Sequence, residues 1–223
     1  MTQQKLQQIL EKLPTEPRMV VSGNFATPRE LVGQIDRLLP AYRLWALNGQ
    51  PGLPDREGVV LETSFVGPGM RHSPRLRYVP SRLSMVPALF RRKMAPDLVV
   101  LHTSLPHAWQ VSLGTEVNVL PAAIKAVRRT CGTVIAQVNP QMPFTYGDGV
   151  IARDEIDLLV EVDEPLGGPR PVPADAASVA IGTAVGARVP DGATIRFQAS
   201  CGSRGSRYRP VMEGGRWSTE ASA

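Results

Sequence analysis

The stretch that decides the fold of this sequence is Val134-Ile-Ala-Gln-Val-Asn-Pro-Gln-Met-Pro-Phe-Thr-Tyr-Gly-Asp-Gly-Val-Ile151. Residues 134–138 are apolar apart from one glutamine and are bounded by Gly132 and Pro140, which predicts a short buried strand. The prolines that follow favour extended backbone before them, and the glycines permit geometry that side chains exclude. The stretch therefore predicts a strand followed by a rigid, non-helical loop.

Polar side chains gather on that loop, where Asn139, Thr145, Tyr146 and Asp148 follow the carboxyl end of the predicted strand. In open α/β sheets ligands bind outside the carboxyl ends of the strands. The loop is therefore a candidate binding site. A plain connecting loop built from turn residues explains the same composition, and both interpretations stay open at this point.

Composition excludes several classes of protein. The chain has 223 residues, 43% of them hydrophobic and 20% charged, which is typical of a soluble globular protein. No apolar run approaches the roughly 18 residues that a membrane span needs. The polar amphipathic start lacks a signal core, and Cys131 and Cys201 lie far apart without metal-ligand spacing. We expect a reduced, cytoplasmic setting without membrane contact.

The net charge of +5 is unevenly distributed. Between Glu62 and Asp97 there is no acidic residue, although seven basic residues fall there: Arg71, Arg75, Arg77, Arg82, Arg91, Arg92 and Lys93. An aromatic content of 5% and the lack of a basic-aromatic stacking pattern argue against nucleic acid. A small phosphorylated ligand and a solvated basic face are the two remaining explanations.

The alternation of helical and strand periodicity predicts an α/β fold with a mostly parallel open sheet and crossover helices. Thr27-Pro-Arg-Glu30 predicts a helix start, with Thr27 as N-cap and Glu30 closing a capping box. Helices are expected at 2–13, 27–39, 81–92 (interrupted by Pro87), 115–129 and 174–188. Strands are expected at 19–22, 43–47, 76–79, 97–102, 134–138, 156–162 and 194–197, and residues 59–66 are expected to be a strand or a buried connector. We assign residues 1–198 to one α/β domain and 199–223 to an irregular, disordered tail.

Catalytic and metal-binding patterns are absent from the sequence. His72, His102 and His107 lack metal-ligand spacing, and no phosphate loop, dinucleotide fingerprint or nucleophile elbow occurs. His102 ends an apolar strand, where a hydrogen-bonded structural histidine is favoured over a catalytic base. The acidic run 154–164 is explained by a solvated strand edge. The residues alone thus predict a ligand-binding domain with no catalytic residue and no metal site.

Several motifs taken together resemble the acetyl-CoA hydrolase/transferase family, which includes 4-hydroxybutyrate CoA-transferase. The resemblance covers 20–197 in order and is specific as a set. The motifs are Ser64-Phe-Val-Gly-Pro68 with Arg71, Tyr78-Val-Pro80, Leu83-Ser-Met-Val-Pro-Ala-Leu-Phe90, Ser112-Leu-Gly114 with the helix to Arg129, Gln137-Val-Asn-Pro-Gln-Met-Pro143 through Gly147-Asp148, Glu155-Ile-Asp157, Val160 to Leu166, and Asp191-Gly-Ala-Thr-Ile195.

The resemblance implies the N-terminal half of an enzyme of two similar α/β domains that hold coenzyme A and an acyl group between them. In this family a glutamate carboxylate attacks acyl-CoA, which gives an acyl-glutamyl anhydride and then a glutamyl-CoA thioester. Coenzyme A is then a substrate, no cofactor is bound permanently, and a short-chain carboxylate or water is the acceptor. A complementary C-terminal domain or a homo-oligomer is the implied partner.

Two departures from the family are visible. Phe144 stands where the family commonly has arginine, which removes a possible carboxylate or phosphate contact. After Phe197 the family continues into the domain that carries the nucleophile, whereas this chain reads Ala199-Ser-Cys-Gly-Ser-Arg-Gly205. We expect 201–223 to be a frameshifted or prematurely ended reading and the chain to be inactive alone. Glu155, Glu161 and Glu164 do not match the catalytic position.

The resemblance and the strand ends together indicate which residues face coenzyme A. A non-catalytic remnant that binds coenzyme A weakly and a sugar-phosphate isomerase-like domain are the alternative functions. The expected ligand-facing residues are Asn24, Gly67, Pro68, Asn139, Thr145, Gly147 and Asp148.

Overall fold

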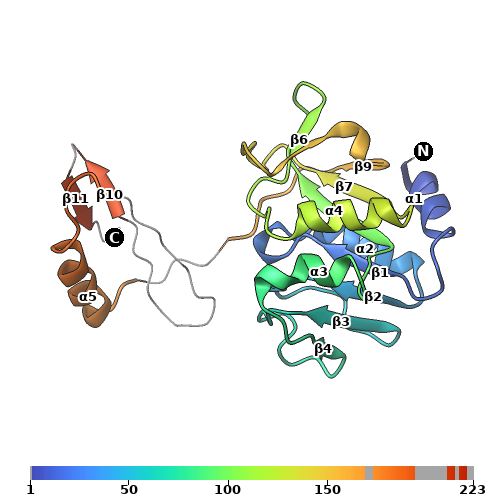
Figure 1. The fold of residues 1–223 in the computed structure, drawn as a ribbon, viewed down its shortest axis with the longest axis horizontal. Coiled ribbons are helices and arrows are strands. Elements are labelled where there is room, and N and C mark those ends of the chain that lie inside the picture. The colour runs from blue at the N-terminus through green and yellow to red at the C-terminus, as the bar shows by residue number, and fades with distance from the viewer. Residues whose placement is uncertain (1, 169–172, 194–209, 214–215, 220–223) are drawn as a thin grey trace. The chain divides into compact units, whose positions relative to one another are not determined.

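The computed structural model describes residues 2–168, 173–193, 210–213 and 216–219. Contacts divide the chain into two compact units, Met1–Gly167 and Gly168–Ala223, and the domain boundary expected after residue 198 stays a prediction. Figure 1 labels their elements. The first unit holds the sheet, its helices and all seven residues expected to face a ligand.

The first unit is built on a seven-stranded sheet in the order β4-β3-β2-β1-β5-β7-β9, and every neighbouring pair is parallel. This confirms the predicted parallel α/β fold. β1 lies in the middle, between β2 and β5. The strands are β1 (Arg18–Val21), β2 (Tyr42–Trp45), β3 (Val59–Thr63), β4 (Leu76–Tyr78), β5 (Leu98–Thr103), β7 (Thr133–Val138) and β9 (Leu158–Glu161).

Helices cover both faces of the sheet, because side chains alternate along each strand. α1 (Thr2–Leu10) and α2 (Arg29–Leu38) pack on one core cluster, which includes Met19 and Val21 of β1. α3 (Val86–Phe90) and α4 (Leu120–Arg129) pack on the other, which includes Val20. Figure 1 shows the same layers, with α3 and α4 in front of the sheet and α2 behind it.

Two predicted helices begin later than expected. The helix expected over 115–129 begins at Leu120, because Asn118 adopts a left-handed backbone (φ 38°) that ends any helix before it. The helix expected over 81–92 is a 3-10 turn, Leu83–Met85, followed by α3. Pro87 stands in the first turn of α3, where its missing N–H has no partner to lose, so it starts that helix and does not interrupt it.

Two short strands were not predicted. β6 (Gln110–Ser112) and β8 (Val150–Ala152) pair antiparallel as a separate two-stranded sheet. Each has three residues, too few to show a period. They join the loop after β5 to the loop after β7, so two loops far apart in sequence are held together.

The second unit contains α5 (Ala176–Gly186), which confirms the helix expected over 174–188. The Asp175 carboxylate caps it by accepting a hydrogen bond from the Ser178 N–H at 2.7 Å. The strand expected at 194–197 lies outside the described residues. Within the expected irregular tail, the described β10 (Pro210–Glu213) and β11 (Arg216–Thr219) form an antiparallel pair. Disorder in 199–223 stays a prediction.

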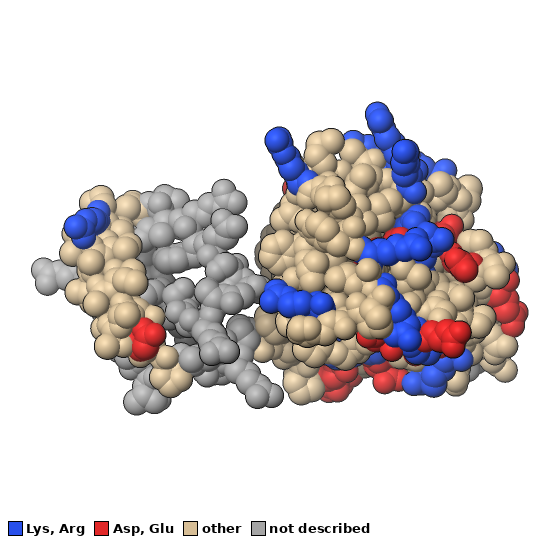
Figure 2. All heavy atoms as spheres, turned by 90° about the horizontal axis from the view of Figure 1, so that it is seen from below, with Lys and Arg blue, Asp and Glu red and all other residues tan. Residues whose placement is uncertain are grey.

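Charged side chains are mixed over the face that Figure 2 presents, with carboxylates among the lysines and arginines. Within the predicted basic stretch, Arg75 forms an ion pair with Asp55 from outside it at 3.1 Å. In this face the basic and acidic groups are interspersed.

Candidate functional site

The candidate site lies where the sheet changes direction. From β1 the chain proceeds through β2, β3 and β4 to one side, and later through β5, β7 and β9 to the other. The crevice outside the carboxyl ends of the strands at such a switch point is the usual ligand site of open α/β sheets. The loops after β1, β2, β3, β5 and β7 all leave from this edge, and the seven expected residues lie on them.

Asn24 follows β1 and is half-buried in a left-handed conformation (φ 47°). Its amide nitrogen donates to Glu116 Oε2 at 2.7 Å, and its amide oxygen accepts a hydrogen bond from Asn48 Nδ2. The backbone N–H of Asn24 also donates to the carbonyl of Leu47 at 3.2 Å. Asn24 is therefore a fixed part of the edge, joined to the loops after β2 and β6.

Glu116 is the partner that sequence reading missed, because it was placed inside a helix. Only 6% of Glu116 is exposed, and its carboxylate accepts from both Asn24 and Asn118, the latter at 3.1 Å. Burial raises the pKa of Glu116, and the two amide donors oppose that rise because they favour the charged form. A buried carboxylate thus lies between the β1 and β6 loops, with both oxygens engaged.

Gly67 and Pro68 follow β3 and differ in their surroundings. A Cβ on Gly67 would lie 2.3 Å from the carbonyl oxygen of Gly49 and 2.4 Å from the carbonyl carbon of Asn48. Gly67 is buried, whereas Pro68 is exposed. The need for glycine at residue 67 comes from backbone packing between the β2 and β3 loops, and Pro68 is the member of this pair that a ligand can reach.

Asn139 follows β7 and is fully buried. Its Nδ2 donates to the carbonyl of Glu164 at 2.8 Å and lies 3.2 Å from His102 Nε2, while its Oδ1 accepts from the Gln141 N–H at 3.0 Å. Every polar atom of the side chain is occupied within the fold. Asn139 therefore holds the loop and is not exposed toward a ligand.

His102 is the last residue but one of β5 and is bonded at both ring nitrogens, as a structural histidine should be. Nδ1 lies 3.2 Å from the carbonyl of Ala26, and Nε2 faces Gln137 Nε2 at 3.3 Å as well as Asn139. A carbonyl can only accept, so Nδ1 carries the proton and Nε2 accepts. Burial lowers the pKa of His102 to about 4, so the ring is neutral at pH 7.

The start of α2 is held differently from the prediction. Thr27 and Glu30 form no capping box: the residue before the helix is Pro28, and no side chain of its own caps it. The Thr27 hydroxyl donates instead to the carbonyl of Asn24 at 3.0 Å. Gln137 Oε1, from β7, accepts the Leu31 N–H at 3.0 Å. A buried side chain distant in sequence supplies the cap, which local pattern reading does not detect.

Thr145 belongs to a cluster around Ser112 of β6. The Ser112 hydroxyl accepts from the N–H groups of Gly114 and Thr145 at 3.1 and 2.9 Å and donates to the carbonyl of Thr145 at 2.8 Å. The Thr145 hydroxyl donates to the carbonyl of Gly114 at 2.9 Å. This cluster pins the β7–β8 loop to the β6–α4 loop.

Gly147 and Asp148 are exposed at the tip of the β7–β8 loop. They line a groove of about 700 Å³ with Asn118 and the outer side of α4. Gly147 has φ +90° and open space around its Cβ position, so the backbone conformation favours glycine there. Of the seven expected residues, Pro68, Gly147 and Asp148 are exposed, Asn24 and Thr145 are half-buried, and Gly67 and Asn139 are buried.

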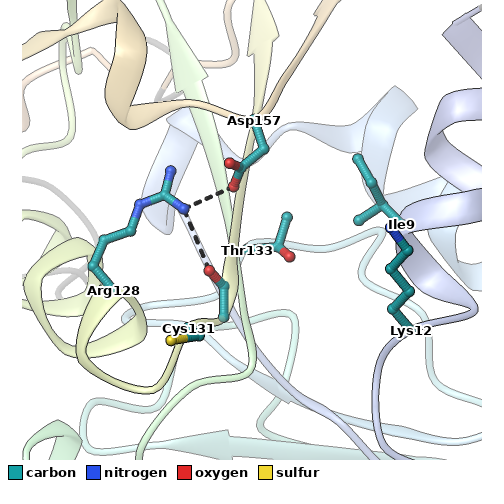
Figure 3. A pocket seen from close by; sticks show the side chains of 7 residues that line it. Ile9, Lys12, Arg128, Cys131, Thr133 and Asp157 are labelled. Carbon is teal, nitrogen blue, oxygen red and sulfur yellow. Dashed lines mark hydrogen bonds and ion pairs between the residues drawn. The ribbon is translucent and has the colours of Figure 1, made fainter.

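A second hollow, of about 480 Å³, lies beside the start of β7 and includes Cys131 and Lys12 (Figure 3). Arg128 Nη1 there donates to Asp157 at 2.9 Å and to the carbonyl of Gly132 at 3.3 Å. Asp157 also accepts the Val134 N–H at 2.8 Å. These bonds join α4 to β7 and to the chain entering β9, so Arg128 and Asp157, drawn in Figure 3, hold these elements together.

Within the part of the chain that the structure describes, no group of three or more His, Cys, Asp or Glu side chains is arranged to hold a metal ion. Among the same residues, none of the helices has the length and apolar character needed to cross a membrane.

Curated relatives of the chain are CoA-transferases. The chain is 31% identical over 191 residues to a succinyl-CoA:acetate/propanoyl-CoA:succinate CoA transferase of Fasciola hepatica, an alignment that covers 79% of this chain and 39% of that protein. It is 33% identical over 138 residues to the 4-hydroxybutyrate coenzyme A transferase of Clostridium kluyveri, which covers 60% of this chain and 31% of that protein. No family model matches.

Among solved structures, 4-hydroxybutyrate CoA-transferase from Porphyromonas gingivalis has a similar fold, with a TM-score of 0.61 at 21% identity. The similarity covers 86% of this chain and 46% of that one. At this identity the likeness shows the fold alone. The chain spans less than half the length of each of these proteins.

Proposed function

Since the chain is a relative of the CoA-transferases, 4-hydroxybutyrate coenzyme A transferase among them, we propose that it is part of an enzyme that moves coenzyme A between short-chain acyl groups and carboxylates. The observation that carries the proposal is the alignment over 79% of the chain with a curated CoA-transferase. The switch-point edge, where Asn24 and Asp148 follow strands β1 and β7, supports a ligand site on this chain.

The proposed reaction proceeds through a glutamate that a complementary domain supplies. The carboxylate attacks the thioester carbonyl, the CoA thiolate leaves, and an acyl-glutamyl anhydride forms. The thiolate then attacks the glutamyl carbonyl, which releases the acyl group as a carboxylate and leaves a glutamyl-CoA thioester. Attack by a second carboxylate completes a transfer, and attack by water completes a hydrolysis. We place this reaction in the cytoplasm, with acetate as one short-chain partner.

Two glutamates beside the candidate site, Glu116 and Glu164, are engaged in hydrogen bonds within the fold. Glu116 is buried with both oxygens bonded, and Glu164 Oε1 accepts from Gln137 Nε2 at 2.6 Å. A nucleophilic carboxylate needs an oxygen that can reach the thioester carbon. We therefore propose that the chain binds coenzyme A but completes the reaction only with a complementary domain.

Calorimetric titration of the purified chain with coenzyme A tests binding. We expect a dissociation constant of about 1 mM or tighter, and no heat from ribose 5-phosphate, which tests the sugar-phosphate alternative. Asn24→Gly keeps the left-handed backbone and is expected to weaken binding by about tenfold, whereas Gln34→Ala, which removes a half-buried amide on α2 that donates to Glu30, leaves it unchanged. Absence of binding by the wild-type chain contradicts the proposal.

An assay with acetyl-CoA and a series of carboxylates tests whether the chain reacts alone. We expect no transfer and no hydrolysis above the rate without protein. Turnover by the purified chain would show that the nucleophile lies within these residues, contrary to the proposed need for a complementary domain.

A further inference from the structure

The residues expected to face a ligand form two groups on either side of the switch point. Asn24, Gly67 and Pro68 lie on loops after β1 and β3, whereas Asn139, Thr145, Gly147 and Asp148 lie on the loop after β7. Gly67 packs on the backbone of Asn48 and Gly49, and Asn48 donates a hydrogen bond to Asn24. These contacts hold the loops after β1, β2 and β3 together. Gly147 and Asp148 share their groove with Asn118. The two groups can hold one ligand only if their separation is fixed.

Glu116 joins the first group to Asn118, which lines the groove with Gly147 and Asp148 of the second group. Its Oε2 accepts from Asn24 Nδ2 at 2.7 Å, and its Oε1 accepts from Asn118 Nδ2 at 3.1 Å. With 6% of the residue exposed, these bonds lie out of water, where the low local dielectric strengthens hydrogen bonds. One carboxylate therefore joins the loop after β1 to the loop that borders the groove.

The carboxylate also decides which way the amides point. Both oxygens of Glu116 act as acceptors in these bonds, so Asn24 turns its nitrogen toward Glu116 and its oxygen toward Asn48. Asn24, Asn48 and Asn118 all have left-handed backbones, with φ of 47°, 47° and 38°. Asparagine tolerates this conformation better than other side chains, yet it still costs free energy unless local bonds hold it. The series from Asn118 through Glu116 and Asn24 to Asn48 supplies those bonds.

We propose that Glu116 is a positioning residue that fixes the β1–α2 loop and the β6–α4 loop at the separation at which both contact one coenzyme A ligand. The ligand part rests on the proposed function, whereas the loop part does not. Glu116 does not touch the reacting atoms, because its two oxygens are occupied by Asn24 and Asn118.

Glu116→Gln tests the loop part, because glutamine keeps the shape but has one acceptor oxygen in place of two. We expect hydrogen exchange, followed by mass spectrometry, to become several-fold faster in peptides covering 22–28 and 113–119 and to stay unchanged in β5 and β7. Glu57→Gln, which removes an exposed carboxylate, is the matched control and leaves both peptides unchanged. Unchanged exchange in both loops of the Glu116→Gln variant overturns the proposal.

Titration with coenzyme A tests the ligand part. We expect Glu116→Gln to weaken binding by about tenfold, the effect of losing one hydrogen bond to a charged group. In the double variant Glu116→Gln with Asn118→Asp, the introduced amide can accept from Asn24 and donate to the introduced carboxylate, so affinity should return to within about threefold of wild type. Faster exchange with unchanged affinity, or failure of this rescue, overturns the positioning role.

The two readouts separate the proposals. If the wild-type chain does not bind coenzyme A, the proposed function fails, and hydrogen exchange still decides whether Glu116 holds the loops. If Glu116→Gln does not fold, Asn118→Gly replaces it, because glycine keeps the left-handed backbone while removing one donor. Faster exchange in 113–119 then supports the proposal, and unchanged exchange overturns it.

Discussion

The loops at the carboxyl ends of the parallel strands form two halves, one after β2 and β3 and the other after β5, β6 and β7, and the two halves are held in place by different means. The loops after β2 and β3 pack backbone against backbone, with Gly67 and Gly69 so close to residues 48–51 that a Cβ would overlap them. The loops after β5, β6 and β7 are held by buried side chains, among them His102, Ser112 and Asn139. The first half should therefore be sensitive to added volume, and the second to lost hydrogen bonds.

The largest effect is expected from Gly67→Ala. The new Cβ would lie 2.3 Å from the carbonyl oxygen of Gly49 and 2.6 Å from its nitrogen, and backbone atoms cannot move aside as a flexible side chain can. We expect the free energy of unfolding in urea to fall by about 4 kcal/mol. Gly33→Ala in α2 is the control, because its Cβ meets only Arg37 Nη1 at 3.7 Å and alanine favours the helix by about 0.5–1 kcal/mol. If Gly67→Ala and Gly33→Ala changed the free energy of unfolding equally, the close backbone packing at Gly67 would not be what makes this half of the edge sensitive to added volume.

Ser112→Ala tests the hydrogen-bonded half without adding volume. The N–H groups of Gly114 and Thr145 lose their shared acceptor in a fully buried place. Leaving buried donors without partners should lower the free energy of unfolding by about 3 kcal/mol. Ser81→Ala removes an exposed hydroxyl and should change it by less than about 0.5 kcal/mol. A loss below about 1 kcal/mol for Ser112→Ala would show that water or a shifted loop replaces the hydroxyl.

His102 makes the same half sensitive to pH. Its pKa is about 4 in the folded chain against an ordinary 6.5, so the unfolded chain binds the proton more readily. The stabilisation by neutral His102 is complete above pH 6.5 and is lost as pH falls toward 4. Between pH 7 and pH 5 the free energy of unfolding should fall by about 2 kcal/mol from this group.

His102→Gln isolates the contribution of His102 from that of the carboxylates. We expect urea unfolding of this variant to show a pH dependence about 2 kcal/mol smaller over that range. His72→Gln, at an exposed histidine, should keep the wild-type pH dependence. If His102→Gln and wild type have the same slope, the ring is not held neutral by burial.

The sequence was most informative where a periodic pattern is long. Apolar runs predicted β5 and β7 to within a residue or two, and three- and four-residue spacing predicted α2. The parallel sheet followed from their alternation. β6 and β8 were missed because three residues show no period, and α4 was extended too far because the apolar spacing of 117–127 was given more weight than the turn-forming Asn118.

The site was harder to predict, because its order depends on contacts distant in sequence. Gln137 caps α2 from 106 residues away, and Glu116 meets Asn24 across 92. Asn139 and Thr145 were identified as polar loop residues, yet their side chains donate hydrogen bonds to backbone carbonyls of neighbouring segments. One signal was available for Glu116: an acidic residue flanked by Thr115 and Asn118, both typical of helix caps and turns, just before the apolar face of a helix. That context indicates a loop.

The central place of β1 has a consequence for the nascent chain. Synthesis runs from the N-terminus, so β1 is made before either neighbour, and pairing with β2, β3 and β4 can follow as each emerges from the ribosome. The other side of β1 stays open until Leu98 and the rest of β5 have been added. Unpaired strand edges are templates for wrong pairing. The edge of β1 that β5 covers thus stays open to wrong pairing while residues 22–97 are being translated.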